Sequence, residues 1–537
     1  MSDPTVASGH NDGAQLATVR EAKRRRTFAI ISHPDAGKTT LTEKFLLYSG
    51  AVQDAGTVKA RSGRRSVRSD WMAMEQERGI SIASAVMQFE YRDHVINLLD
   101  TPGHRDFSED TYRVLAAVDA AVMVLDTAKG IEPQTRKLFE VCRARDMPVI
   151  TFLNKMDRPG LDPLELLDQI EEQIGLKPTP VTWPVGIPGY FRGVIDRRTG
   201  DFVRYTRTAR GATEAAEEIL SPEQALAEEG DIWETASEES ELFTEIGSDF
   251  DRASFLAGKT SPLFVGSALT NFGVRHLLDG VIDMAPAAED RLDETGEFRP
   301  IEDQFSGFVF KVQANMDKNH RDRLAFLRVC SGEFERGMTL SHERTGRPFN
   351  TKYAVSVFGA ERETLEEGYP GDVIGFINAT DLQIGDTLYA GDKVKFPPIP
   401  RFEPEEFAVA RPIDVSKTKQ FRKGLAQLEE EGVVQVLRDA QSGDVAPILA
   451  AVGIMQFEVF AHRLENEFNA KVEISPTSYQ VARRTDTDTA QKLASISAVR
   501  VMVAGDGTQM ALFESIYRLQ RLEADHPEWC LEHIVAE

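Results

Sequence analysis

The sequence predicts a multidomain α/β plus β-barrel fold: an N-terminal α/β domain on a mainly parallel sheet, an antiparallel β-barrel as second domain, and an α+β C-terminal domain. The first 160 or so residues alternate apolar runs with helical periodicity, which indicates βαβ units. From Phe305 to about Tyr389, short strand patterns are separated by glycines, as in a small barrel. After Pro400 the mixed pattern returns. A chain of 537 residues has room for roughly three or four domains.

The N-terminal domain is predicted from apolar runs that have the length of buried strands. These runs are Phe28–Ile31, Val95–Leu99, Ala121–Leu125, Val149–Leu153 and Pro262–Ser267. Helical patterns lie between or after them, at Leu41–Leu47, Thr111–Ala117, Gln134–Arg143, Leu161–Ile174 and His276–Met284. A parallel sheet covered by helices binds its ligand at the carboxyl ends of its strands. We therefore look for chemistry in the loops that follow those ends.

The other elements follow from local patterns. Barrel strands are predicted at Ser306–Val312, Leu324–Cys330, Tyr353–Phe358 and Asp372–Ile377, with a turn at Gly385–Asp386. In the C-terminal domain, strands are predicted at Phe407–Val415, Pro447–Val452, Lys471–Ile474 and Val499–Val503, and helices at Lys417–Glu431, Met455–Phe468 and Gln509–Leu519. Within the N-terminal domain, short strands are predicted at Gly193–Ile195 and Phe202–Tyr205, before an acidic tract.

These patterns give four segments. We expect a disordered leader at 1–24, because Met1–Thr18 is small and polar with no apolar core, which also excludes a secretory signal. The N-terminal α/β domain covers 25–288, with an inserted subdomain at about 160–260. The barrel covers 304–396 and the C-terminal α+β domain 401–537. The polar, acidic stretch from Pro286 to Pro300 reads as a linker.

Composition narrows the class of protein. The chain has 28% charged residues and a formal net charge of −24, which argues against attraction of nucleic acid by the whole surface. Basic residues are concentrated at Arg20–Arg26 and Lys59–Arg68, whereas Gly211–Asp251 holds no lysine or arginine. Each run can equally be a solvated face. Three widely spaced cysteines are typical of thiols in a reducing cytoplasm, so we expect a cytoplasmic protein.

A phosphate-binding loop is predicted between the strand Phe28–Ile31 and the helix Leu41–Leu47. Its residues are Ser32, His33, Pro34, Asp35, Ala36, Gly37, Lys38, Thr39 and Thr40. In such a loop, backbone N–H groups and the helix N-terminus face the polyphosphate. Lys38 supplies a point charge for the β- and γ-oxygens, and the Thr39 hydroxyl can bind Mg²⁺. Ser32 stands where the general pattern has its first glycine.

Three further loops follow strand ends and complement the same ligand. Asp100, Thr101, Pro102, Gly103 and His104 follow one strand; the carboxylate can hold Mg²⁺ through water, and the Gly103 N–H can meet a γ-phosphate. Asn154, Lys155, Met156 and Asp157 follow another, and the Asp157 carboxylate can accept the two N–H groups of a guanine edge. Gly266, Ser267, Ala268 and Leu269 follow a third, where N–H groups can meet the guanine oxygen.

Each short match has an ordinary alternative. Asp100 could cap a helix, Asn154–Asp157 could form a polar turn, and Ser267–Ala268 alone carries little information. The loops occur in the right order, however, and each follows a strand. We therefore predict a guanine nucleotide rather than an adenine nucleotide as the ligand.

The segment Arg78-Gly79-Ile80-Ser81-Ile82 lies between the phosphate loop and Asp100. With the Asp-Thr-Pro-Gly-His loop, it resembles the translational GTPases, whose usual threonine is replaced here by Ser81. Among them, Ser32–Thr40 and Asp106–Arg113 resemble the bacterial class II release factors, the peptide chain release factor 3 family. The resemblance runs from about Arg25 to Val535. Elongation factor G is similar over the first domain but carries additional C-terminal domains.

The resemblance implies a P-loop GTPase domain at 25–288, with the inserted subdomain between Asp157 and Pro262. It implies GTP and GDP as substrate and product, and Mg²⁺ held by Thr39, Ser81 and, through water, Asp100. His104 would orient the attacking water, with slow hydrolysis away from the ribosome. An apolar residue usually stands near that water in the family, where this chain has Pro34. The implied partners are the ribosome, through its RNA and proteins, and class I release factors, with no membrane or DNA partner and a monomer off the ribosome.

The resulting hypothesis is a ribosome-dependent GTPase that promotes dissociation and recycling of class I release factors after peptide release. Arg24–Arg26 and Arg61–Arg68 are candidate contacts for ribosomal RNA. One alternative is a translocase or ribosomal-protection GTPase similar to elongation factor G. A second is a GTP-dependent adaptor that does not hydrolyse GTP. A third is a metabolic enzyme that uses GTP as a co-substrate, for which the sequence offers no acceptor site.

Overall fold

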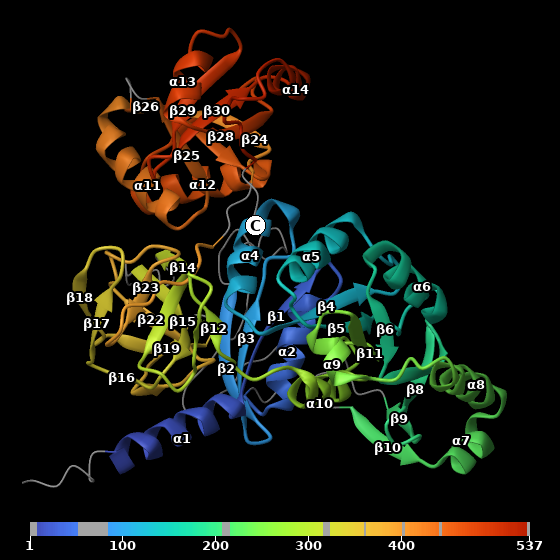
Figure 1. The fold of residues 1–537 in the computed structure, drawn as a ribbon. Helices are drawn as coiled ribbons and strands as arrows, with labels where there is room; N and C mark the ends of the chain where they lie inside the picture. The colour runs from blue at the N-terminus through green and yellow to red at the C-terminus, as the bar shows by residue number, and fades with distance from the viewer. Residues whose placement is uncertain are drawn as a thin grey trace, which may run out of the picture.

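The chain forms three domains in a computed structural model: the N-terminal domain, a barrel (yellow in Figure 1) and a C-terminal domain (orange to red). The described residues are 8–51, 84–206, 215–314, 323–358, 361–399, 403–439 and 443–533. The predicted fold class is confirmed by a mainly parallel N-terminal sheet, an antiparallel second domain and a mixed C-terminal domain. Among the described residues, no helix is both long and apolar enough to cross a bilayer.

The N-terminal sheet has the strand order β2-β3-β1-β4-β5-β11-β6. All neighbouring strands are parallel except β2, which runs antiparallel to β3. The strands are β1 (Arg25–Ser32), β2 (Ala85–Tyr91), β3 (His94–Asp100), β4 (Ala120–Asp126), β5 (Val149–Asn154), β6 (Lys177–Pro180) and β11 (Thr260–Val265). The main helices are α2 (Lys38–Tyr48), α4 (Ser108–Ala116), α5 (Pro133–Ala144), α6 (Pro163–Ile174) and α10 (Val274–Met284).

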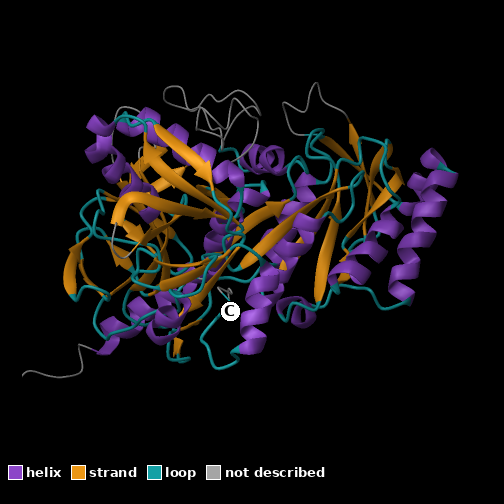
Figure 2. Cartoon of the chain, turned by 90° about the horizontal axis from the view of Figure 1, so that it is seen from above, coloured by secondary structure: helices purple, strands orange, loops and turns teal. Residues whose placement is uncertain are grey.

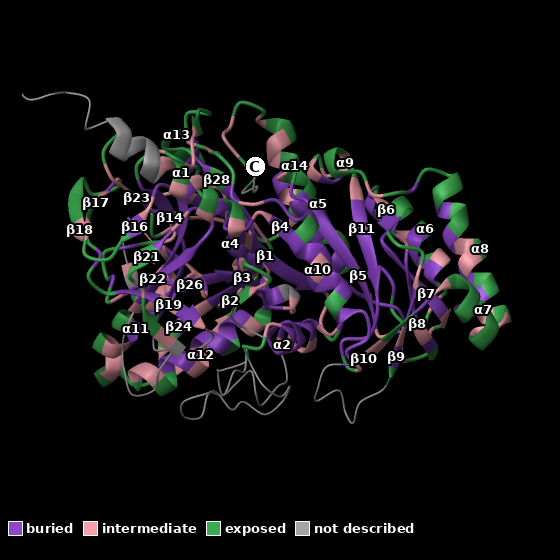
Figure 3. Ribbon diagram, turned by 90° about the horizontal axis from the view of Figure 1, so that it is seen from below, coloured by how far each residue is buried: buried purple, intermediate pink, exposed green. Residues whose placement is uncertain are grey.

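Successive residues of the central strands enter two separate cores. Ala29 and Ile31 of β1 pack in one cluster, whereas Phe28 and Ile30 pack in the other. A strand points alternate side chains to opposite faces, so a strand covered on both faces reads as a continuous apolar run. Figure 2 shows helices beside these strands, and Figure 3 shows the strands buried.

A small antiparallel sheet is inserted between β6 and β11, in the order β10-β9-β8-β7. Its elements are β7 (Thr182–Ile187), β8 (Tyr190–Asp196), β9 (Phe202–Thr206), β10 (Ala216–Leu220), α7 (Pro222–Glu229), α8 (Asp231–Glu245) and α9 (Arg252–Leu256). Trp183 is fully buried under α8, and its indole N–H donates to Glu239 Oε2 at 2.9 Å. The acidic tract from 215 onward therefore forms a strand and helices that cover the inserted sheet.

A strand pairing connects the barrel to the N-terminal sheet, where Phe358 of β19 pairs with Met87 of β2. Its strands are β14 (Ser306–Ala314), β15 (Arg323–Ser331), β16 (Phe334–Glu335), β17 (Thr339–His342), β18 (Arg347–Asn350), β19 (Ala354–Phe358), β20 (Glu361–Thr364), β21 (Glu367–Gly368), β22 (Val373–Ile377) and β23 (Thr387–Tyr389). Before the barrel, β12 (Arg291–Leu292) and β13 (Phe298–Arg299) form a short hairpin within the predicted linker.

The C-terminal domain has a sheet in the order β27-β24-β26-β25-β29-β30-β28. Its strands are β24 (Glu406–Pro412), β25 (Gln435–Asp439), β26 (Gly443–Ala451), β27 (Val472–Pro476), β28 (Val481–Thr485), β29 (Val499–Val503) and β30 (Gln509–Phe513). Its helical elements are η3 (Val415–Lys417), α11 (Thr418–Glu430), α12 (Ile454–Phe468), α13 (Thr487–Leu493) and α14 (Ile516–Asp525).

The predicted helix Gln509–Leu519 is wrong. Gln509–Phe513 is instead β30, paired with both β28 and β29. Its side chains alternate between two cores: Met510 and Leu512 pack in one, and Ala511 and Phe513 in the other. The helix α14 begins only after Ser515, whose hydroxyl accepts the N–H of Tyr517 at 3.2 Å. A strand buried on both faces cannot be told from a helical segment by its apolar run alone.

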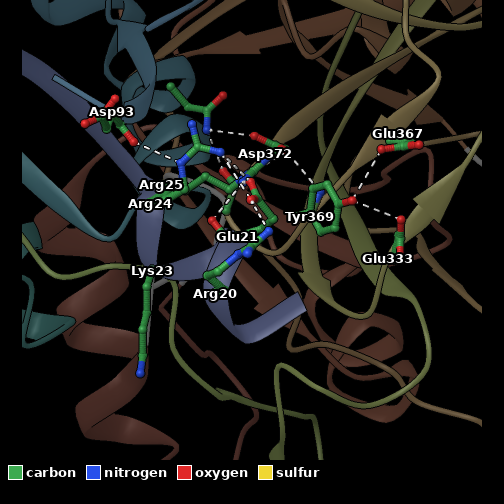
Figure 4. Close-up of polar contacts among 12 residues, drawn as sticks. Arg20, Glu21, Lys23, Arg24, Arg25, Asp93, Glu333, Glu367, Tyr369 and Asp372 are labelled. Atoms are coloured by element: carbon green, nitrogen blue, oxygen red, sulfur yellow. Dashed lines mark hydrogen bonds and ion pairs between the residues drawn. The ribbon is translucent and has the colours of Figure 1, made fainter. Parts of the chain in front are cut away.

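The predicted disordered leader is also wrong for residues 8–24, which form α1 (Ser8–Arg24). The end of α1 is tied into the molecule, because Ala22 is fully buried and Glu21 pairs with both Arg24 and Arg25 (Figure 4). The composition of the segment shows none of this, because the partners that fix it lie in β1 and in the turn between β2 and β3.

The side chains of the basic run Arg24–Arg26 therefore make contacts within the protein. Arg25 Nε donates to Asp372 Oδ2 at 2.8 Å, and its guanidinium lies 4.7 Å from the centre of the Tyr369 ring. Arg24 Nε donates to the Asp93 carbonyl, and Arg26 Nε to the Ile282 carbonyl, each at 2.9 Å. Because Arg25 is buried, we correct its interpretation as an RNA contact. Contact of Arg24 and Arg26 with RNA stays a prediction. The second basic run, Lys59–Arg68, lies outside the described residues.

Candidate functional site

The predicted phosphate loop connects β1 to α2 at the carboxyl end of the sheet. Ser32 is the last residue of β1, and α2 begins at Lys38. The chain reverses through two residues with positive φ, Asp35 at 65° and Gly37 at 102°. The first N–H groups of α2 have no partner within the helix, which makes its N-terminus a binding site for anions.

Gly37 cannot be replaced without strain, for two reasons. Its φ lies in the region that favours glycine. In addition, a Cβ at this position would overlap the Asn154 side-chain amide. The close approach of Asn154 to Gly37 permits a hydrogen bond, in which Asn154 Nδ2 donates to the Ala36 carbonyl at 2.7 Å.

Asn154 also holds the third predicted loop. Its Oδ1 accepts the N–H of Ala268 at 2.8 Å, and the residue is buried at the end of β5. One amide therefore joins the phosphate loop, the Asn154–Asp157 loop and the Ser267–Leu269 loop. The structure brings together three segments that are spread over more than 200 residues of the sequence.

The remaining residues of the two base-side loops are also positioned by specific contacts. Ser267 Oγ donates to Asp157 Oδ1 at 2.6 Å. Lys155 has a φ of 71°, and its ammonium pairs with Asp126 Oδ2 at 2.8 Å. Met156 is fully buried and its N–H donates to the Gly266 carbonyl at 3.2 Å. Leu269 lies half-exposed at the edge of this group.

The Asp100–His104 loop lies against the phosphate loop. Asp100 ends β3, and its carboxylate forms a buried ion pair with Lys38. The Thr101 hydroxyl donates to the Ile30 carbonyl at 2.8 Å. A Cβ at Gly103 would lie 3.6 Å from Cα of Pro34, in ordinary van der Waals contact. Pro34 and Gly103 are thus neighbours.

His104 is one-third exposed, and its Nδ1 lies 3.3 Å from Asp106 Oδ1. A protonated Nδ1 donates to this carboxylate, whereas an unprotonated Nδ1 accepts the N–H of Asp106, whose nitrogen also lies 3.3 Å away. His33, by contrast, is held on the phosphate loop, with Nδ1 at 2.6 Å from Glu132 Oε2 and 2.8 Å from the Pro34 carbonyl. The two histidines of the predicted site therefore have different partners.

The residues predicted to hold Mg²⁺ fit that ion as far as they are described. Thr39 lies in the first turn of α2 and Asp100 at the end of β3, and the Lys38–Asp100 pair places these two elements together. A hydroxyl and a carboxylate are oxygen donors of the kind that Mg²⁺ prefers. Ser81, the third predicted ligand, lies outside the described residues.

Two acidic residues of the site were missed at the sequence level. Asp126 ends β4 and pairs with Lys155, and Glu132 pairs with His33. Asp126 had a recognisable signal, because it follows the apolar run Ala121–Leu125 as Asp100 follows its own strand. Glu132 had none, since its loop shows no pattern that links it to His33.

Comparison with known proteins agrees with this geometry. The family described as "Elongation factor Tu GTP binding domain" matches residues 23–287, "Elongation factor G domain 2" matches 304–391, and "Class II release factor RF3, C-terminal domain" matches 396–523. The chain is therefore a translational GTPase, an enzyme that hydrolyses GTP.

Similar proteins extend over nearly the whole chain. A protein of Synechococcus elongatus named peptide chain release factor 3 is 49% identical over 96% of this chain and 94% of its own. The protein of the same name from Microcystis aeruginosa is 49% identical over 95% of each chain. A crystal structure from Thermus thermophilus shares the fold, with a TM-score of 0.68 at 22% identity over 90% of this chain and 71% of that one. The chain belongs to the peptide chain release factor 3 family, the class II release factors.

Proposed function

We propose that this protein acts in translation termination as a ribosome-dependent GTPase, which promotes dissociation and recycling of class I release factors after the peptide is released. It works in the cytoplasm, alternates between GTP and GDP forms, and is a monomer off the ribosome. The observation that carries the proposal is the set of strand-end loops joined through Asn154, within a chain of the release factor 3 family.

The phosphates are bound by the loop Ser32–Thr40, with Lys38 facing the β- and γ-oxygens and the α2 N-terminus facing the anion. Asp157 accepts two N–H groups of guanine. The 2.6 Å hydrogen bond from Ser267 supports this role, because it fixes one carboxylate oxygen of Asp157. Ala268 and Leu269 present backbone N–H groups to the guanine oxygen, and Lys155 covers the ring.

Thr39, Ser81 and, through water, Asp100 hold Mg²⁺ in this proposal. When bound, the ion neutralises charge on the β- and γ-phosphate oxygens. Lys38 would then exchange its present partner, Asp100, for phosphate oxygens. The buried ion pair between them supports this, because both side chains already face the same space.

His104 orients the water that attacks the γ-phosphate, and the Gly103 N–H meets the same phosphate. Phosphoryl transfer is accelerated mainly by positioning and electrostatic stabilisation. The Nδ1 of His104 faces Asp106, and in this proposal that contact changes when the imidazole turns to the water. Contact with the ribosome supplies the energy for the change, which accounts for slow hydrolysis in its absence. Pro34, beside Gly103, limits access to the water.

The alternative of a translocase or ribosomal-protection GTPase is less well supported. The match of residues 396–523 to the release factor 3 C-terminal domain favours termination. A non-hydrolysing adaptor would not need Lys38, Thr39, Asp100 and His104 together.

The test is GTP turnover with and without ribosomes, combined with an assay of release-factor recycling. We expect ribosomes to stimulate turnover, and His104→Ala to reduce the stimulated rate by roughly 100-fold or more. The control is His94→Ala, at the first residue of β3 and so at the opposite end of the strand from Asp100, which should leave the rate unchanged. Recycling of the release factor that proceeds equally well without GTP, or with His104→Ala, would contradict the proposal.

A further inference from the structure

The first residues of the C-terminal helix α12 (Ile454–Phe468) lie against the loop that carries His104. Asp106, in the short helix η1 (Arg105–Phe107), accepts the N–H of Met455 on Oδ2 at 2.9 Å. The first N–H groups of a helix need partners from outside the helix, and a carboxylate there also interacts favourably with the helix dipole. Asp106 therefore caps a helix that lies 349 residues away in the sequence.

Gly453, the residue before α12, makes room for this contact. A Cβ at Gly453 would overlap the carboxylate of Asp106. The φ of Gly453 is −153°, which any residue adopts. The glycine is therefore required by the close approach of Asp106 rather than by its own backbone conformation.

The same carboxylate contacts the catalytic histidine. Asp106 Oδ1 lies 3.3 Å from His104 Nδ1, while Oδ2 binds α12. The Asp106 side chain is only 9% exposed. The His104 ring also packs edge-on against Phe107, with ring centres 6.3 Å apart. Asp106 thus connects the imidazole to the C-terminal domain through its two oxygens.

The surrounding contacts form an interface around this connection. Phe107 is buried against Val459 of α12, with Met455 packed beside them. On the neighbouring turn of α4, Arg113 donates to the carbonyls of Glu431 and Gly432 at 3.4 and 3.3 Å. The segment that follows Gly103 is therefore seated on the C-terminal domain by both polar and apolar groups.

We propose that Asp106 is a positioning residue that restrains His104 while the C-terminal domain is docked on η1. This inference rests on the proposed role of His104. When α12 moves away from η1, Asp106 loses the Met455 N–H, and its hold on His104 is released so that the imidazole can turn to the water. A ribosome that displaces the C-terminal domain can then activate hydrolysis without touching the nucleotide.

Removal of the restraint should raise hydrolysis where no ribosome is present. We expect Asp106→Ala to increase the single-turnover rate of GTP hydrolysis about tenfold without ribosomes. With saturating ribosomes, the rate should stay within about twofold of the wild type. Asp106→Asn, which keeps an acceptor for Met455 but lacks the charge, should give a smaller increase. Amide exchange at Met455 should be faster in Asp106→Ala.

Gly453→Ala tests the same link from the other side, because it keeps Asp106 but blocks its approach to α12. We expect the same increase without ribosomes. The matched control is Gly505→Ala in the same domain, where a Cβ would also meet a carboxylate, that of Glu429, which pairs with Arg438 rather than with His104. This variant should behave as the wild type.

A double variant separates positioning from a merely structural role. If Asp106 acts through His104, then Asp106→Ala in a His104→Ala background should give no increase. Thermal melts of each variant identify those that fail to fold. If Asp106→Ala does not fold, the rates of Asp106→Asn and Gly453→Ala test the inference. An unchanged or lower ribosome-free rate in the folded variants, or an increase that persists without His104, overturns the inference. Absence of ribosome stimulation in the wild type would instead overturn the proposed function.

Discussion

At the scale of residues, Asn154 joins loops that the nucleotide would otherwise have to hold in place. Its amide donates to the Ala36 carbonyl and accepts from the Ala268 N–H. Both groups are buried, and a buried polar group that loses its partner costs about 1–3 kcal/mol. These contacts within the protein arrange the site for a ligand, which reduces the entropy that binding must offset.

We expect Asn154→Ala to lower the free energy of unfolding by about 2–4 kcal/mol, because it leaves two buried groups unpaired. The affinity for GDP should fall more than tenfold, since two loops lose their common support. Urea denaturation and fluorescence titration with labelled GDP measure these effects.

The control for this variant is Asn466→Ala, whose exposed side chain bonds only to the His462 carbonyl of its own helix. It should change stability by no more than about 0.5 kcal/mol. If Asn154→Ala binds GDP as tightly as this control does, Asn154 does not organise the site.

At the scale of elements, α10 is attached to the inserted sheet through His276. The Tyr205 hydroxyl of β9 lies 3.1 Å from His276 Nδ1, and Asp196 of β8 lies 3.9 Å from Nε2. Burial lowers the pKa of His276 to about 4, although the Asp196 carboxylate opposes the shift. The imidazole is therefore neutral in the folded protein at pH 5, whereas it is protonated in the unfolded chain.

This shift predicts a loss of stability on acidification. Because the pKa is lower in the folded state than in the unfolded state, unfolding takes up a proton between pH 6.5 and 4, and stability falls as the pH decreases through that window. We expect the His276 contribution to fall by about 1–2 kcal/mol between pH 7 and pH 5. His276→Gln should reduce this dependence, as measured by urea denaturation at both pH values. Equal slopes for the two proteins would contradict it.

The sequence predicted elements and loops well where the information is local. Loops at strand ends, such as Asp100–His104, follow apolar runs of recognisable length, and parallel strands bring their ends to one edge. β30 was misassigned because its contiguous apolar residues serve two cores. The contact of Asp106 with Met455 could not be predicted, since no local pattern relates residues 349 positions apart.

At the scale of the whole molecule, charge is distributed unevenly over a chain of net charge −24. A basic run before and within the start of α11 contains Arg411, Lys417, Lys419, Arg422 and Lys423. Within the part of the chain that the structure describes, four of these residues are exposed and form no ion pair: Arg411, Lys419, Arg422 and Lys423. Local cations of this kind can bind phosphates although the net charge is negative.

We expect the triple variant Lys419→Glu, Arg422→Glu and Lys423→Glu to weaken ribosome binding. The slope of log affinity against log salt should become shallower by roughly 2, because each lost phosphate contact removes about 0.7–0.9. The control replaces three other lysines by glutamate, Lys352, Lys393 and Lys395 on the barrel side, which changes the net charge by the same amount. Co-sedimentation with ribosomes over a salt series measures the slopes of both triple variants. Equal slopes would exclude the α11 surface as a ribosome contact.

The carboxylate of Asp372 has a consequence for how the barrel can move. It accepts from Arg25 Nε and the Tyr369 N–H on Oδ2, and from Gln88 Nε2 and Asn97 Nδ2 on Oδ1. Three of these donors come from β1, β2 and β3, so a small slide of the barrel would leave several buried groups unpaired at once. We therefore expect any separation of the barrel from the sheet to be cooperative, because these hydrogen bonds would break together.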